Sequence, residues 1–238
     1  MTVKPYADDA SKREQVERMF DNISPRYDLL NRLCSLGIDQ GWRRKTMQEL
    51  AKEPVDQLLD VATGTADLAI MGADLAKHVI GADISQGMLD QGSVKIDKAG
   101  MASRIELVQA DAAELPFAEA TFDAVTVAFG VRNFEVLENG IRGMARVLKP
   151  GGRLLVLEFS NPQRAPFKQL FRFYFHHVMP LIGKLVSRDN AAYSYLPESV
   201  DAFPQGNAFL AVLKRCGLKE GKARTLTFGV ATLYVARK

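Results

Sequence analysis

The chain has 238 residues, of which 47% are hydrophobic and 25% charged, as expected for one large α/β domain with attached segments. Its net charge of only +3 argues against a chain that binds nucleic acid as a polycation. No run approaches the ~18 consecutive apolar residues that span a bilayer, and the charged N-terminus lacks the apolar segment of a signal peptide. Cys34 and Cys216 match no metal-ligand spacing and suit a reducing compartment. We expect a single domain over 1–238, a cytoplasmic location and no metal site.

Residues 1–50 precede the first predicted strand and are mostly polar, with helical spacing. An aromatic-rich patch, Phe-Asp-Asn-Ile-Ser-Pro-Arg-Tyr-Asp, lies within them at 20–28. Two interpretations fit this segment. Its helices cover one face of the sheet, or they form a lid over a bound cofactor, because active-site lids often come from such attachments.

A nucleoside-binding pattern follows. Residues 58–67 are a short apolar run that breaks into small residues, and a second apolar run at 79–83 ends in Asp83. This is the layout of a strand–turn–helix–strand site in which the acid binds the ribose hydroxyls. The turn at 60–66, Asp-x-Ala-x-Gly-x-Ala, differs from the dinucleotide fingerprint and suits S-adenosylmethionine, which has no pyrophosphate. Small residues at a buried strand end can also serve packing alone, but Asp83 at the expected distance favours the nucleoside site.

Three further apolar runs are short, nearly unbroken and separated by stretches with helical spacing, at 105–108, 124–129 and 154–159. Strands of this kind are buried on both faces, as in a parallel sheet with helices on each side. Lys-Pro-Gly-Gly at 149–152 is expected to end the preceding helix and turn the chain. Near the C-terminus, the pattern predicts two strands at 223–228 and 232–236, joined by Gly229. We therefore expect an α/β fold with a mostly parallel sheet closed by an antiparallel hairpin.

Residues 160–204 form an insertion before this hairpin. From 159 to 188 there is no acidic residue, whereas basic residues recur at Arg164, Lys168, Arg172, Lys184 and Arg188. Aromatic residues are interleaved with them at Phe167, Phe171, Phe173, Tyr174 and Phe175. A basic, aromatic, amphipathic segment can lie on an anionic membrane or enclose an apolar substrate tail. A helix packed on its own sheet with a solvated basic face fits the same pattern.

Five motifs recur in one order, at 20–31, 111–117 (Asp-Ala-Ala-Glu-Leu-Pro-Phe), 121–123 (Thr-Phe-Asp), 129–133 (Phe-Gly-Val-Arg-Asn) and 148–160, which begins Leu-Lys-Pro-Gly-Gly. With them the chain resembles the ubiquinone/menaquinone biosynthesis C-methyltransferases over nearly its full length, more weakly in the first ten residues and around 187–207. The motif at 129–133 and Ser-Pro-Arg-Tyr-Asp at 24–28 are the more specific to this family. The other pieces occur in many methyltransferases.

The resemblance implies a class I S-adenosylmethionine-dependent methyltransferase with a Rossmann-like fold and a mostly parallel seven-stranded sheet. It also assigns the cofactor site by position. Gly64 and Thr65 lie in the turn after the first strand, where Thr65 offers a hydroxyl and a backbone N–H near the methionine portion. Asp83 takes both ribose hydroxyls, Asp111 accepts from the adenine amino group, and the Ala112 N–H meets a ring nitrogen. A helix N-cap is the alternative role for Asp111.

The substrate that the resemblance implies is a prenylated naphthoquinol or benzoquinol, methylated on a ring carbon. The enzyme then aligns donor and acceptor and excludes water, and a cation stabilises developing phenolate character. Arg132, just past the fourth strand, is our catalytic candidate for that cation, and Asn133 helps to position the same oxygen. Capping, or pairing with an acid such as Glu135, is the structural alternative for Arg132. Tyr27 and Asp28 are weaker candidates.

Several alternatives stay open. We expect demethylmenaquinol as the substrate, in menaquinone biosynthesis. The alternatives are 2-polyprenyl-6-methoxy-1,4-benzoquinol of ubiquinone biosynthesis and O-methylation of a related quinone precursor. A nicotinamide-dependent dehydrogenase would prefer three glycines in the first turn, and a membrane module without catalysis would lack the cofactor residues. Because prenylated quinols reside in the bilayer, we expect transient contact with an anionic membrane at its inner face. Whether the chain forms a homodimer is left open.

Overall fold

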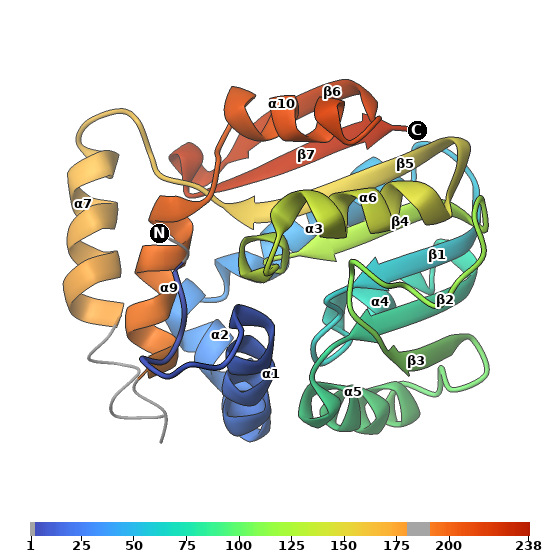
Figure 1. The fold of residues 1–238 in the computed structure, drawn as a ribbon, viewed down its shortest axis with the longest axis horizontal. Helices are drawn as coiled ribbons and strands as arrows, with labels where there is room; N and C mark the ends of the chain where they lie inside the picture. Colours follow the sequence, from blue (N-terminus) through green and yellow to red (C-terminus); the bar gives the residue numbers. More distant parts are fainter. Residues whose placement is uncertain (1–2, 180–190) are drawn as a thin grey trace.

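The computed structural model describes residues 3–179 and 191–238. Within these residues, seven strands form one sheet in the order β3-β2-β1-β4-β5-β7-β6 (Figure 1). Their bounds are β1 Val55–Val61, β2 Ala76–Asp83, β3 Ile105–Gln109, β4 Phe122–Ala128, β5 Leu148–Phe159, β6 Lys219–Leu226 and β7 Ala231–Arg237. Strands β1 to β5 are parallel, and β7 pairs antiparallel with both β5 and β6. The predicted mostly parallel sheet with a closing hairpin is confirmed.

Both faces of the sheet are covered by helices, and successive residues of a strand point to opposite faces. Leu58 packs in the core beneath α3, α4 and α5, whereas its neighbour Leu59 packs in the core beneath α6 and α10. These helices are α3 Ile38–Leu50, α4 Asp67–Gly72, α5 Gln86–Lys98, α6 Leu137–Val147 and α10 Asn207–Arg215. Burial on both sides is the reason that the central strands are unbroken apolar runs in the sequence.

Two predicted boundaries are wrong. Strand β6 ends at Leu226, and the next residues form the 3₁₀ turn η4, Thr227–Gly229, in which Phe228 has a positive φ of 56°. The last two residues of the predicted strand, 227 and 228, therefore belong to a turn. Lys-Pro-Gly-Gly at 149–152 lies within β5 rather than before it, and the register between β4 and β5 shifts there. Local turn residues produce an irregularity inside this strand.

The N-terminal segment contains α1 Lys12–Ile23, the 3₁₀ turn η1 Ser24–Arg26, α2 Tyr27–Ser35 and then α3. A capping box starts α1: the Ser11 hydroxyl accepts from the Glu14 N–H, and the Glu14 carboxylate accepts from the Ser11 N–H. Helix α3 packs on one face of the sheet, whereas α1 and α2 lie toward the carboxyl ends of the parallel strands (Figure 1).

The insertion after β5 forms α7 Phe167–Phe173, a π-helical turn η3 Tyr174–Val178, and α9 Ala191–Ala202. No side chain of α7 is buried, and the helix stands at the outer edge of the molecule (Figure 1). Helix α9 packs against the 3₁₀ turn η2, Val131–Asn133, which follows β4. Lys184 and Arg188 lie outside the described residues. Among the helices in the described ranges, none is long and apolar enough to cross a membrane.

Candidate active site

Two pockets open at the carboxyl ends of the parallel strands, where the strand order reverses between β1 and β4. Open α/β sheets bind their ligands at such switch points. The first, which we call the loop pocket, lies against the loops after β1, β2, β3 and β4 and under α1 and α2. Its wall includes five of the residues predicted from sequence: Gly64, Asp83, Asp111, Ala112 and Asn133.

The turn after β1 is built from small residues in left-handed conformation. Ala62, Gly64 and Ala66 have φ values of 51°, 56° and 64°, a region that larger or β-branched side chains rarely occupy. A Cβ on Gly130, in the facing loop, would lie 2.5 Å from the Ala62 Cβ, so a side chain there would collide with the turn. The alternating small residues seen in the sequence thus allow two loops to approach closely along the pocket wall.

Asp60 supports this turn from beneath. It is 1% exposed and accepts hydrogen bonds from the hydroxyls of Thr63 and, on β4, Thr126, both at 2.7 Å. Burial raises the pKa of Asp60 to about 6, and the two hydroxyl donors limit that rise. Because Asp60 ties β1 to β4 at the switch point, we assign it a positioning role.

Asp83 ends β2 and faces the loop pocket. One carboxylate oxygen accepts from the Gly64 N–H at 2.8 Å, and the other accepts from the Ser85 N–H at 2.9 Å. Burial raises its pKa to about 6 against the effect of these donors. A carboxylate oxygen has a second lone pair. Asp83 can therefore accept two vicinal hydroxyls while it keeps both backbone contacts.

Asp111 lies in the turn after β3. One of its oxygens accepts from the Ala113 N–H at 2.8 Å, and the other pairs with Arg13 of α1 at 2.9 Å. The residue thus stabilises a turn rather than the N-cap that was the alternative role. Ala112 is buried under α6, where a Cβ on Gly143 would lie 2.1 Å from the Ala112 carbonyl oxygen. The loop after β3, which carries Asp111 and Ala112, is therefore fixed by α1 on one side and by α6 on the other.

Thr65 lies beside the loop pocket, and its side chain bonds residues of α2 and α5. The hydroxyl donates to Asp28 of α2 at 2.6 Å and accepts from Lys95 of α5 at 3.0 Å. Lys95 also pairs with Asp28 at 2.9 Å and with Asp67. The predicted contact of Thr65 with the methionine portion stays a prediction. The weak catalytic candidate Asp28 is part of this tether between α2 and the loop.

A second tether fixes α1. The Asp21 carboxylate accepts from the Ser85 hydroxyl at 2.6 Å and from the Gly87 N–H at 3.0 Å, at the start of α5. Phe20 and Tyr27 from the same N-terminal segment line the loop pocket. Helices α1 and α2 thus cover this pocket while α3 packs on the sheet. That the cover opens and closes as a lid stays a prediction.

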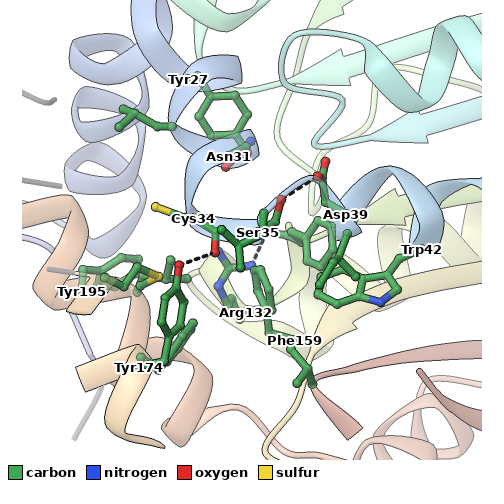
Figure 2. Close-up of a pocket in the computed structure, with 18 of the residues that line it drawn as sticks. Tyr27, Asn31, Cys34, Ser35, Asp39, Trp42, Arg132, Phe159, Tyr174 and Tyr195 are labelled. Carbon is green, nitrogen blue, oxygen red and sulfur yellow. Dashed lines mark hydrogen bonds between the residues drawn. The ribbon is translucent and has the colours of Figure 1, made fainter. Parts of the chain in front are cut away.

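The second pocket, which we call the apolar pocket, has a volume of about 240 Å³ and lies among α2, α3, α7, α9 and the ends of β4 and β5 (Figure 2). Its wall is mainly aromatic and aliphatic, with Trp42, Phe159, Phe171, Phe175, Met179 and Leu196 among its members. Phe20, Tyr27, Phe129 and Asn133 line both pockets, so the two meet at these side chains.

Unpaired polar atoms converge in this apolar setting. Within the described part of the chain, four buried side-chain atoms have no hydrogen-bond partner: Arg43 Nε, Arg132 Nε, Asn133 Oδ1 and the Tyr195 hydroxyl. All four residues line the apolar pocket. Buried polar groups are paired in the great majority of cases, and ligand pockets combine apolar walls with a few such groups. The wall therefore suits an apolar ligand that carries oxygen atoms.

Arg132 lies in η2 and enters the apolar pocket (Figure 2). Its Nη1 donates to Glu158 at 2.7 Å and also to the Phe129 carbonyl. The guanidinium carbon lies 5.4 Å from the centre of the Phe159 ring. The structural alternative, pairing with an acid, is thus present, but the acid is Glu158. The named partner Glu135 was wrong, because Glu135 accepts from the backbone N–H of Lys12 at 3.1 Å. Sequence distance misled here because the acidic partner comes from the adjacent strand.

Comparison with known proteins decides the class. Residues 8–238 match the model of the ubiE/COQ5 methyltransferase family. The chain belongs to this family. It is 50% identical over 238 residues to a demethylmenaquinone methyltransferase of Bacteroides fragilis, covering 99% of this chain and 97% of the relative. It is 43% identical over 230 residues to a ubiquinone/menaquinone biosynthesis C-methyltransferase of Geotalea daltonii, covering 95% and 97%.

Solved structures confirm the predicted fold of this ubiE/COQ5 family member. A SAM-dependent methyltransferase from Thermotoga maritima matches with a TM-score of 0.65 at 14% identity, over 94% of this chain and 99% of that one. Another from Aquifex aeolicus matches with a TM-score of 0.59 at 15% identity, over 94% and 97%. The protein is thus an S-adenosylmethionine-dependent methyltransferase, and the dehydrogenase alternative is set aside.

The loop pocket fits this methyl donor. Asp83 has free acceptor capacity, and Asp111 and Ala112 line the same pocket. That these residues hold the ribose and the adenine stays a prediction. The rings of Phe20 and Tyr27 stand where the two pockets meet, and aromatic faces attract a cation such as a sulfonium. The reacting methyl group would then face the apolar pocket.

The residues of the apolar pocket that were not identified from the sequence include Trp42 and Arg43 of α3, and Tyr195 of α9. Arg43 Nε lies 3.6 Å from Asp39, one turn earlier. None of the three belongs to a motif that was recognised in the sequence. No local signal could have identified them, because only the packing of α3 and α9 brings them to the pocket.

Proposed function

We propose that this family member methylates a ring carbon of demethylmenaquinol, a prenylated naphthoquinol, in menaquinone biosynthesis. The observation that carries the proposal is the junction of the two pockets at Phe20, Tyr27, Phe129 and Asn133. A cofactor site opens there directly onto an apolar pocket large enough to receive an aromatic ring. The name of the Bacteroides fragilis relative supports this substrate. The benzoquinol of ubiquinone biosynthesis is the second candidate, because the Geotalea daltonii relative is named for both quinones.

The chain's own residues supply alignment and electrostatics. Bound S-adenosylmethionine provides an electrophilic methyl group. Phe129 and Phe159, whose ring centres are 4.5 Å apart, form an aromatic wall against which a quinol ring can pack. The guanidinium of Arg132 supplies a cation that favours ionisation of the quinol hydroxyl beside it. The surrounding apolar side chains exclude water, which strengthens that effect.

Polar groups approach the apolar pocket from two elements, and a 1,4-quinol carries its two oxygen atoms at opposite ends of the ring. Arg132 and Asn133 come from η2, whereas Asp39 and Arg43 come from α3. The Ser35 hydroxyl donates to Asp39 at 2.6 Å (Figure 2), and the other Asp39 oxygen lies 3.6 Å from Arg43 Nε. A ring bound between the two elements would meet a polar partner at each oxygen. This supports recognition of a quinol over an apolar hydrocarbon.

The decisive experiment follows a labelled methyl group. Purified protein is incubated with methyl-labelled S-adenosylmethionine and either demethylmenaquinol or the methoxybenzoquinol, and the product is characterised by NMR. We expect the label on a ring carbon of the naphthoquinol. A methyl ether would establish the O-methyltransferase alternative, and transfer to the benzoquinol alone would establish ubiquinone biosynthesis. Absence of transfer to any quinol would overturn the proposal.

We also propose that the enzyme acts in the cytoplasm and contacts the inner face of an anionic membrane through α7. Leu170 and Phe173 are 62% and 61% exposed on this helix, beside the exposed cations Lys168 and Arg172. The Tyr174 hydroxyl bonds the Cys34 carbonyl at 3.0 Å, which joins the insertion to the end of α2 beside the apolar pocket. A prenylated substrate could therefore enter from the bilayer.

Vesicle binding tests this contact. Lys168→Glu with Arg172→Glu should weaken co-sedimentation with anionic vesicles, because each cation near such a surface contributes about 1 kcal/mol. Lys219→Glu with Lys222→Glu on β6 makes the same charge change on an exposed strand and serves as the control. Equal loss in both variants would indicate a non-specific charge effect, and no loss in either would refute the membrane contact. Sedimentation of the free protein tests the homodimer.

A further inference from the structure

The Tyr195 hydroxyl is buried without a hydrogen-bond partner in the described part of the chain. The residue is 3% exposed, and its side chain lines the apolar pocket. It comes from α9, which packs against η2, the turn that carries Arg132 and Asn133. Tyrosine hydroxyls in protein interiors usually find a partner, because an unpaired one costs the free energy of its lost hydration. This hydroxyl is therefore poised for a partner that binds.

The surroundings of Tyr195 indicate what that partner is. Burial raises the pKa of its hydroxyl, which remains protonated and can act as a donor. Its electrostatic neighbours are Arg132 and Glu158. Glu158 accepts from Arg132 Nη1 at 2.7 Å, from the Phe159 N–H at 2.8 Å and from the Arg132 N–H at 3.3 Å, and the Tyr195 hydroxyl makes no hydrogen bond to it. A ligand oxygen between Tyr195 and the free Nε of Arg132 would satisfy both unpaired atoms.

We propose that Tyr195 is a catalytic residue: its hydroxyl donates a hydrogen bond to the quinol oxygen that Arg132 also contacts, and the two together favour the phenolate form. The inference rests on the proposed function. In the step itself, the ring hydroxyl first releases its proton to bulk water outside the apolar wall. The ring carbon then forms a bond to the methyl group while the sulfur–methyl bond electrons return to sulfur. Loss of the ring-carbon proton and reprotonation of the oxygen restore the quinol, so one proton is released per methyl group.

Tyr195→Phe removes only the donor. We expect kcat to fall roughly 10- to 100-fold, within the range seen when one donor to a developing oxyanion is lost. The acidic limb of the pH–rate profile should move to higher pH, because the quinol hydroxyl ionises less readily without the donor. Affinity for S-adenosylmethionine should not change. The melting temperature of the free protein should stay equal or rise, because the variant removes an unpaired buried hydroxyl.

Tyr234→Phe is the matched control. Tyr234 is also fully buried, but its hydroxyl accepts from the Gly206 N–H at 2.8 Å, and Tyr234 lines neither pocket. The same substitution should there lower the melting temperature and leave kcat and the pH profile unchanged. Trp42, the only tryptophan of the chain, lines the apolar pocket, so its fluorescence reports quinol binding without the cofactor. We expect about three- to tenfold weaker quinol binding for Tyr195→Phe alone.

Each outcome decides the matter. A wild-type protein that methylates the quinol, with an unchanged kcat and pH profile in Tyr195→Phe, overturns the role of Tyr195 and leaves the proposed function intact. A lower melting temperature with normal kcat shows a structural hydroxyl and also overturns it. If the wild-type protein methylates no quinol, the proposed function fails and this inference fails with it.

Discussion

Arg132 and Glu158 form a buried ion pair of 2.7 Å between the turn after β4 and the end of β5, with side chains 8% and 0% exposed. The pair places a positive charge in the wall of the apolar pocket, where Glu158 compensates it. Removing one partner of such a pair typically costs about 3–5 kcal/mol, because the other charge stays buried alone. Substitutions at Arg132 must therefore be analysed for stability and turnover together.

Arg132→Lys retains the charge but loses the planar fork that contacts Glu158 and the Phe129 carbonyl. We expect turnover to fall at least about tenfold with nearly unchanged affinity for S-adenosylmethionine. Arg153→Lys is the control, since Arg153 is 4% exposed and binds the carbonyls of Leu50 and Glu53 away from both pockets. The control should lose stability and keep its turnover. Steady-state kinetics and thermal unfolding of both variants would expose a purely structural role for Arg132.

Asp83→Asn should weaken S-adenosylmethionine binding more than about tenfold, because a charged acceptor of two hydroxyls becomes a poorer one. The amide also presents a donor to either the Gly64 or the Ser85 N–H, so a small change in stability accompanies the loss. Asp123→Asn is matched, since Asp123 also accepts two backbone N–H groups, at the opposite end of β4. Calorimetric titration showing equal affinity in wild type and Asp83→Asn would refute the ribose assignment.

Cofactor affinity should fall as pH decreases through about 6, where Asp83 takes up a proton and loses acceptor capacity. Stability of the free protein should change in the opposite direction. The folded pKa lies above the ordinary value of 3.8, so the folded state binds more protons in this window and the free energy of unfolding rises as pH falls. Titration and thermal unfolding across the window measure both slopes. A slope of affinity that survives in Asp83→Asn would assign the dependence to another group.

Asp28→Ala should release the cover over the loop pocket, because it removes the contacts of α2 with Thr65 and Lys95. Losing roughly 1 kcal/mol of tether would speed cofactor dissociation about five- to tenfold. Asp56→Ala, which breaks the exposed pair with Lys77 at 3.0 Å, is the control and should have no effect. Stopped-flow dissociation rates distinguish them, and equal rates would show that α2 is fixed by packing alone.

Much of the fold could be predicted from the sequence because its signals are local. Burial on both faces makes the central strands continuous apolar runs, and the turn at 60–66 needs small residues for its left-handed backbone. Asp83 follows at the end of the next strand, where parallel strands bring their carboxyl ends together. The loop-borne part of the cofactor site is thus determined by strand ends whose order in space follows from their order along the chain.

Which residues line the apolar pocket proposed for the substrate could be learned only from the tertiary structure. Glu158 is the partner of Arg132 because β4 and β5 are adjacent, although 26 positions separate the two residues. Arg43 precedes β1 in the sequence and Tyr195 lies between β5 and β6, yet both reach the apolar pocket, and no motif links them to Arg132. Contacts between distant segments depend on how whole helices pack, and helix packing has no short-range signature in sequence. The sequence by itself therefore determined the strands and the cofactor loops, and packing determined which polar atoms converge on the pocket.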